Sequence, residues 1–247
     1  MDQMSREQQI VFADSTHRRL RAFHECGHAA WLFLDGRMSD IVGISIAPRR
    51  TGDGPNDVDT GVCEYLGQPY SREWVEEGDG RKTQLSRATR VIAMSFAGPV
   101  SEYHEEDCES AANMWTRVLY DWWGTCEPAV SFDDNPSLLR TDFGSALAAA
   151  YHIYPTARER LDDLGKQAYG FLEKVFNWTH ELFTMAEVLS LVHTLAAEFE
   201  PSNVDEISGD RARELLRESW HGDSLGVPLE SIGKKWVRRD LREGNAN

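Results

Sequence analysis

The chain has 247 residues, of which 41% are hydrophobic, and its formal net charge is −15. A chain of this length buries a sizeable core, either as one large domain or as two small ones. The acidic balance argues against binding to nucleic acids and to anionic membranes, because both attract basic protein surfaces.

Cysteine usage and the N-terminus indicate the compartment. Four cysteines are scattered along the chain at positions 26, 63, 108 and 126, with no C-x-x-C pair, which is typical of reduced thiols in a cytosol. The first seven residues lack the apolar core of a signal peptide. No stretch approaches the roughly 20 apolar residues of a membrane span. We therefore expect a cytoplasmic protein without a membrane span.

The most informative motif lies at residues 24–28, which read His-Glu-Cys-Gly-His. In a helix, two imidazoles four residues apart lie on one face and can both reach a Zn²⁺ ion at about 2.0–2.1 Å. Glu25 points off that face, yet it can still reach a water molecule on the ion and accept its proton. The motif is typical of zinc-dependent peptidases. The alternative is a pair of helical histidines that binds no metal.

The surrounding residues predict a helix over 16–34. Ser15 is a candidate N-cap, no proline follows until after the motif, and Gly36 occupies the position of a C-terminal helix glycine. Apolar residues recur at three- and four-residue steps, which predicts a buried face beside the two histidines. These residues are Leu20, Phe23, Gly27, Ala30 and Leu34.

The next segment predicts a small β element. The segment 41–47 is short, rich in β-branched residues and followed by Pro48, which is typical of a strand. Residues 61–66 form a second candidate strand. Between them, residues 49–57 are rich in Gly, Asp and Pro and predict a loop. Residues 68–82 are polar and predict a loop or a lid.

Helical patterns follow from Thr83. An apolar stripe continues until Gly98-Pro99, where we expect the helix to kink or end. Residues 113–123 are rich in aromatic side chains and predict a buried helix. A further helix is expected over residues 143–151.

The last third of the chain predicts two long helices and a tail. Pro155 opens one helical segment, and residues 185–195 form a second, so we expect an antiparallel helix pair. Residues 211–220 predict one more short helix. The fold class is therefore mainly α with a small sheet or hairpin, in one domain over residues 1–220, followed by a partly basic tail at 221–247.

The order of these segments resembles the zinc peptidase domain of FtsH-type AAA+ proteases. Four segments carry the resemblance: residues 24–29 (His-Glu-Cys-Gly-His-Ala), 44–49 (Ile-Ser-Ile-Ala-Pro-Arg), 96–102 (Phe-Ala-Gly-Pro-Val-Ser-Glu) and 207–216, which begins Ile-Ser-Gly-Asp and ends Leu-Leu. The resemblance implies a helical, zincin-type metallopeptidase domain and covers roughly residues 17–217.

The resemblance also implies the third metal ligand, an aspartate that opens a helix. Asp142, in Asp-Phe-Gly-Ser-Ala, matches that pattern. With His24 and His28 it would give three protein ligands and leave a position free, as a catalytic zinc site requires. The alternative is that Asp142 or Thr141 only caps the following helix. Glutamates of a second helix, Glu102, Glu105 and Glu106, are the fallback ligands.

A further implication concerns the strand within residues 42–47. The resemblance implies that this strand lies at the edge of the sheet beside the zinc and pairs with an extended substrate. The alternative is an ordinary, half-buried sheet strand. The two interpretations are compatible.

The expected function is that of a zinc-dependent endopeptidase acting on unfolded or flexible protein segments, with Glu25 as the general base. The family normally carries an ATPase module and membrane helices before this domain, and neither is found in this sequence. We therefore also consider a protease that needs a separate ATPase partner, and a catalytically weak zinc-binding module for regulation or assembly. Family members form rings, so a homo-oligomer is a further expectation.

Overall fold

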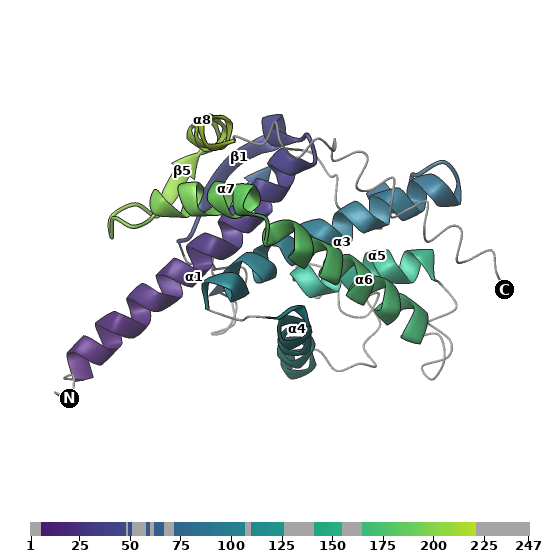
Figure 1. Cartoon of the computed structure of the whole chain (residues 1–247), viewed down its shortest axis with the longest axis horizontal. Coiled ribbons are helices and arrows are strands. Elements are labelled where there is room, and N and C mark those ends of the chain that lie inside the picture. The colour runs from purple at the N-terminus through teal and green to yellow at the C-terminus, as the bar shows by residue number, and fades with distance from the viewer. Residues whose placement is uncertain are drawn as a thin grey trace.

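The computed structural model describes residues 6–47, 49–50, 58–59, 62–66, 72–106, 110–125, 141–154 and 165–220. The described part is mainly helical with a small antiparallel sheet, as the sequence predicts (Figure 1). The elements are α1 (Arg6–Leu34), η1 (Met38–Asp40), β1 (Ile41–Ser45), β2 (Arg49–Arg50), β3 (Val58–Asp59), β4 (Val62–Tyr65), α2 (Arg72–Glu76), α3 (Gly80–Glu105), α4 (Ala111–Thr125), α5 (Asp142–Ile153), α6 (Gly165–Phe183), α7 (Ala186–Ala197), β5 (Glu206–Ser208) and α8 (Gly209–Ser219).

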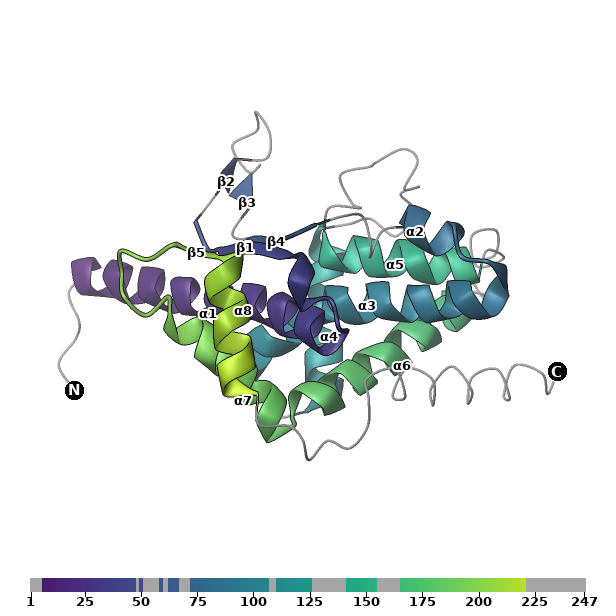
Figure 2. The same ribbon diagram turned by 90° about the horizontal axis from the view of Figure 1, so that it is seen from above.

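The two long helices α1 and α3 form the centre of the fold and pack directly on each other (Figure 2). Gly27 makes this close packing possible. A Cβ atom at this position would lie 2.4 Å from the carbonyl oxygen of Ala97 and 2.4 Å from Oγ of Ser101. Any larger residue would push the helices apart, so the glycine inside the motif sets the distance between α1 and α3.

A three-stranded antiparallel sheet in the order β4-β1-β5 packs on α1. Ile44 pairs with Cys63 of β4 on one side and with Ile207 of β5 on the other. The expectation that the strand within 42–47 is an edge strand is therefore wrong, because β5 covers its second edge. The edge strands of the described sheet are β4 and β5, and β4 lies on the side of β1 opposite β5.

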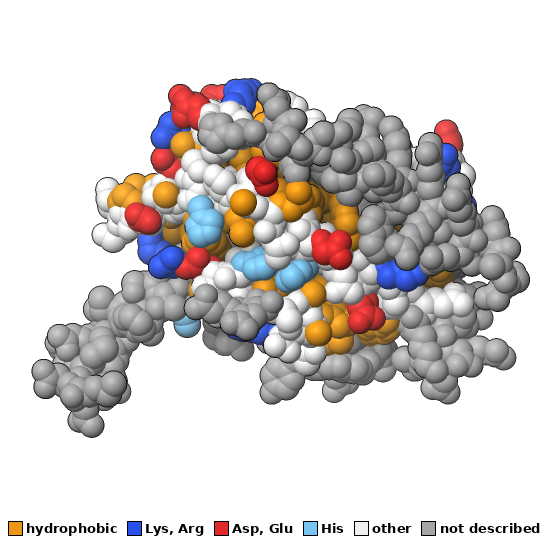
Figure 3. All heavy atoms as spheres, viewed as in Figure 1, with side chains coloured by type: hydrophobic (Ala, Val, Ile, Leu, Met, Phe, Trp, Pro, Cys, Tyr) orange, Lys and Arg blue, Asp and Glu red, His pale blue; other side chains and the backbone are white. Residues whose placement is uncertain are grey.

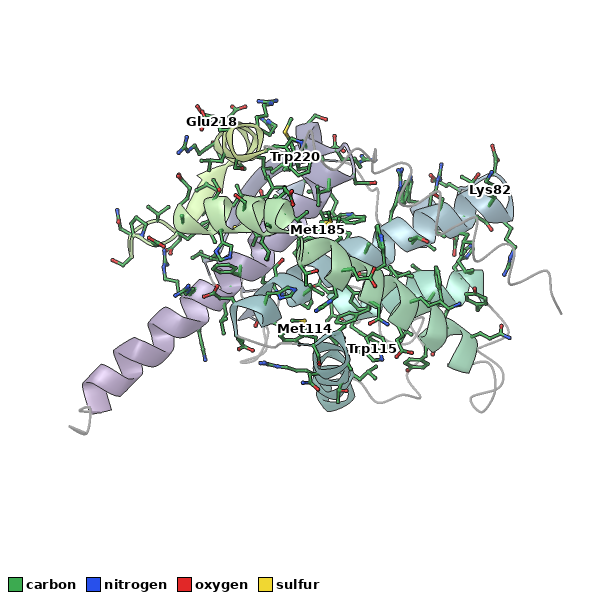
Figure 4. The ribbon with its side chains drawn as sticks, viewed as in Figure 1. Lys82, Met114, Trp115, Met185, Glu218 and Trp220 are labelled. Atoms are coloured by element: carbon green, nitrogen blue, oxygen red, sulfur yellow. The ribbon has the colours of Figure 1, made fainter. Side chains whose placement is uncertain are left out.

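The remaining helices cover the central pair. α5 and α6 pack on α3, whereas α7 packs on α1 and α8. Figure 4 shows Met114 and Trp115 of α4 on the side that faces the rest of the fold, and the ring of Trp115 contacts those of Phe96 (5.9 Å between centroids) and Phe176 (5.3 Å). These aromatic contacts join α4 to α3 and α6.

The predicted antiparallel pair of long helices is not formed. α6 and α7 diverge from the turn at Thr184 and Met185 in both ribbon views, and each packs on different helices (Figures 1 and 2). The reason is that each apolar face meets a different partner, α3 and α5 for α6 and α1 and α8 for α7. Periodicity predicted the two apolar faces correctly and could not say which neighbour each would meet.

Two predicted boundaries are also wrong. α1 begins at Arg6, so Ser15 lies inside the helix and is not its N-cap. Residues 68–82, expected as a loop, contain α2 and the start of α3. At Gly98-Pro99, where a kink or an end was expected, α3 does not end but continues to Glu105, because the proline removes a single backbone hydrogen bond while the buried side chains around it hold the helix in place.

Other predictions are confirmed. Gly36 has a positive φ of 73°, as a C-terminal helix glycine should, and β4 and α8 lie where strand and helix were expected. The tail at 221–247 and the helix start at Pro155 lie outside the described residues. Among the helices that the structure describes, none has the length and apolar character needed to cross a bilayer.

Candidate metal centre

The structure brings the three predicted metal ligands together. Nε2 of His24 lies 2.9 Å from Oδ2 of Asp142, and Nε2 of His28 lies 3.5 Å from the same oxygen. One ligand atom from each residue lies within 4.8 Å of the other two, and this is the one such group of three or more His, Cys, Asp or Glu residues in the described part of the chain. Two consecutive turns of α1 and the first residue of α5 thus converge on one point.

The second nitrogen of each imidazole is occupied on the opposite side of the ring. Nδ1 of His24 lies 2.8 Å from Oε2 of Glu102, and Nδ1 of His28 donates to the carbonyl oxygen of Met94 at 2.9 Å. A carbonyl can only accept, so it fixes the His28 tautomer with its proton on Nδ1 and leaves a lone pair on Nε2. In metal sites, such outer hydrogen bonds orient the histidine ligands.

The fallback ligands do not join the group. Glu102 contacts the far side of the His24 ring, where it orients the imidazole instead of sharing a metal with it. Glu105 forms an ion pair with Arg19, and Glu106 forms one with Arg117. The glutamates of α3 therefore leave Asp142 as the carboxylate that faces both Nε2 atoms.

The alternative role of Asp142, capping α5, is taken by its neighbour. Thr141 is the N-cap residue, with an extended backbone, and its side chain accepts a hydrogen bond from the backbone N–H of Gly144 at 3.0 Å. The carboxylate of Asp142 is thus released from capping and turns toward the histidines. Two adjacent residues divide the tasks that the sequence could not assign.

Gly98 of α3 forms the floor of the site, a role that sequence reasoning missed. A Cβ atom at this position would lie 2.5 Å from Nε2 of His28 and 2.7 Å from Nε2 of His24. These are the two atoms that would bind the ion, so no larger side chain fits. The sequence signal was available, because a glycine in the middle of an otherwise apolar helix usually marks a close approach.

The electrostatics of the cluster favour a cation. Burial by itself would lower the pKa of His24, yet hydrogen bonds with Asp142 and Glu102 raise it well above its ordinary value. Burial likewise opposes a raised pKa of His28, and the Asp142 carboxylate overcomes it. The pKa of Asp142 lies far below its usual range, against the effect of burial, because of the two histidines. The carboxylates around the two imidazoles therefore favour positive charge at this point.

Glu25 is buried beside this cluster, with 7% of its surface exposed. Its carboxylate contributes to the raised pKa values of both His24 and His28, which places its charge within electrostatic range of each. It also raises the pKa of the Cys63 thiol on β4, after the larger effect of burial. The charge of Glu25 thus acts on both histidines of the motif and on a residue of β4.

The donor set fits zinc. Two neutral imidazoles and one carboxylate are the ligands of catalytic zinc sites that keep one position open. The hydrogen bonds on both Nδ1 atoms meet the further requirement that the imidazole ligands be held in a fixed orientation.

Comparisons with known proteins add no relative. No protein-family model matches this sequence, and a search of curated proteins finds no match either.

Proposed function

We propose that this protein is a zinc-dependent endopeptidase that hydrolyses peptide bonds in unfolded or flexible polypeptide segments. The observation that carries the proposal is the convergence of His24, His28 and Asp142 around one point, with the buried carboxylate of Glu25 beside it. His24, His28 and Asp142 would hold the ion. When bound, zinc supplies Lewis acidity that polarises the scissile carbonyl and makes water more acidic.

Glu25 performs the proton transfers in this proposal. It accepts the proton of the attacking water and returns it to the leaving amine, so that the carboxylate is regenerated. Because Glu25 directly follows His24 on α1, its side chain points away from the ligand face but stays adjacent to that face. Glu102 holds the His24 ring through Nδ1 at 2.8 Å and acts as a positioning residue.

The edge strand β4 supports an extended polypeptide as the substrate. β4 pairs with β1 along one edge, and no described strand covers its other edge. Cys63 and Tyr65 of β4 lie within electrostatic range of Glu25 and Asp142 respectively. A chain added to this edge would bind mainly through its backbone, which gives affinity with little sequence selectivity.

The resemblance to the FtsH-type peptidase domain supports the same reaction, because the motif, the glycine of α3 and the aspartate of α5 occur in the same order. It also frames the two alternatives, a protease that depends on a separate ATPase and a zinc-binding module without turnover. Buried Glu25 favours the enzyme over the module. Location in the cytoplasm and a homo-oligomeric state belong to the proposal as well.

The test is the substitution Glu25→Gln with zinc content and cleavage of casein measured together. Removing the base should lower cleavage by about 10²- to 10⁴-fold while zinc stays bound, because none of the ligands changes. The matched control is Glu173→Gln on the exposed face of α6, which makes the same chemical change and should leave cleavage intact.

Two outcomes would contradict the peptidase proposal. One is full cleavage by Glu25→Gln. The other is stoichiometric zinc with no cleavage by either protein, with or without an added ATPase unfoldase, which would favour the regulatory module.

A further inference from the structure

A second histidine pair lies away from the candidate metal centre, between α3 and α6. His104 lies in the last turn of α3, and His180 lies in the last turn of α6. Their rings stack, with centroids 5.1 Å apart and an angle of 29° between the planes. Figure 3 shows histidine side chains touching on the face where these helix ends meet.

Both Nε2 atoms of this pair are buried and have no hydrogen-bond partner within the described part of the chain. A buried polar atom without a partner destabilises the folded state, so native proteins rarely keep one without a reason. Here two such atoms lie on adjacent rings. A group that binds both nitrogens would remove both penalties at once.

The two imidazoles are ready to act as ligands. Burial, together with the neighbouring His180, lowers the pKa of His104 to about 4. Burial lowers the pKa of His180 as well, against the opposing effect of Glu181. Both rings are therefore neutral at pH 7, and a neutral imidazole offers a lone pair to a metal.

The two histidine pairs have similar distances between ring centroids but different ring orientations, with 74° between the planes of His24 and His28 and 29° between those of His104 and His180. The centroids of His24 and His28 lie 5.0 Å apart, and those of His104 and His180 lie 5.1 Å apart. We propose that His104 and His180 form a second metal site, which binds a borderline divalent ion such as Zn²⁺ with two imidazoles and completes its coordination with water. Imidazole is the protein ligand that such ions share.

An ion at this site would link α3 to α6. α3 also carries Gly98 and Glu102, which line and orient the first centre. Binding would thus fix the end of the helix that supports the candidate active site. The second site uses none of the side chains of the first centre, and its existence does not depend on the proposed peptidase activity.

The test is the number of Zn²⁺ ions that the metal-free full-length protein binds at neutral pH, measured by calorimetric titration. The wild type should bind two ions. His104→Gln and His180→Gln should each bind one, because a single imidazole is too weak a site to fill. The control is His193→Gln, an exposed histidine of α7 whose ring contacts Phe23, and this variant should still bind two ions.

A second measurement separates the two sites. The double variant His24→Gln/His28→Gln should keep one ion, and the imidazole NMR signals of His104 and His180 should shift when Zn²⁺ is added to the wild type. A single bound ion in the wild type would overturn the proposal, even if a variant failed to fold. Two bound ions in both His104→Gln and His180→Gln, with native circular dichroism, would overturn it as well.

Discussion

The two histidine pairs share one ring spacing and differ in everything around it. His24 and His28 come from consecutive turns of one helix, have both Nδ1 atoms hydrogen-bonded, and face a carboxylate with both Nε2 atoms. His104 and His180 come from two helices and have two buried Nε2 atoms without partners. The comparison teaches that ring spacing alone does not define a metal centre. The carboxylate and the outer hydrogen bonds determine charge, orientation and affinity.

The same difference reverses the electrostatics. Carboxylates around the first pair raise the pKa of both histidines, whereas the second pair experiences mainly burial and has lowered pKa values. The surroundings of the first pair therefore favour a positive charge, whereas those of the second pair favour neutral imidazoles.

The largest effect that we predict is the loss of metal binding at the first histidine pair alone. Gly98→Ala should abolish zinc binding at the first centre and reduce cleavage to background, because the new Cβ would lie 2.5 Å from Nε2 of His28. The pair His104 and His180 should still bind its ion. Titration with Zn²⁺ should therefore give one ion in place of two.

Gly170→Ala in α6 is the matched control. A Cβ atom there meets nothing within 4 Å, so this substitution should leave both sites intact and stabilise the helix by about 0.5–1 kcal/mol. Full activity of Gly98→Ala with two bound ions would show that the first centre does not need a glycine at position 98.

A smaller effect should follow from Glu102→Gln. The amide oxygen can still accept from Nδ1 of His24, but the negative charge is lost, so we expect zinc affinity at the first centre to fall by about 10- to 100-fold. The affinity of the second site should not change. Competition with a chelator of known affinity measures both constants.

Glu105→Gln, one turn further along α3, removes an ion pair with Arg19 and should change neither constant. An equal loss of affinity in the two variants would mean that the net charge of α3, and not the hydrogen bond to His24, sets the affinity.

The smallest effect is a difference in the pH dependence of the metal-free protein. The folded-state pKa of His24 lies above 6.5, so its contribution to stability is complete below pH 6.5 and is lost as the pH rises through that raised pKa. For His104 the folded-state pKa is about 4, so its contribution is present above pH 6.5 and is lost as the pH falls toward 4.

Histidine NMR signals, followed against pH in the presence of a chelator, should show this order directly. His24 should titrate above pH 6.5 and His104 near pH 4, with each signal assigned by its loss in the matching His→Gln variant. Titration of both residues near 6.5 would contradict the electrostatic contrast between the pairs.

Much of the first centre could be predicted from the sequence. The four-residue spacing of His24 and His28 needs only the helical repeat, and Asp142 was found because the order of segments resembles that of a known peptidase family. Gly98 was visible in the sequence as a glycine inside an apolar helix, and it was interpreted only as a helix breaker. Its role became clear when the packing of α3 against α1 placed it under both Nε2 atoms.

The errors share one cause. β1 was expected at a sheet edge, and α6 and α7 were expected to pair. Both expectations concern which element lies beside which, and β5, which covers β1, lies more than a hundred residues further along the chain. The stacking of His104 on His180 also joins distant segments, and no local pattern indicates it.

The sequence by itself determined what backbone hydrogen bonding and side-chain periodicity can specify, namely the helices, the short strands and a pair of imidazoles on one helical face. The tertiary structure decided which carboxylate meets those imidazoles, which ring nitrogens remain available for a metal, and which strand is left at the edge. These features depend on contacts between distant segments, and such contacts are selected by the packing of the whole core and not by neighbours in the chain.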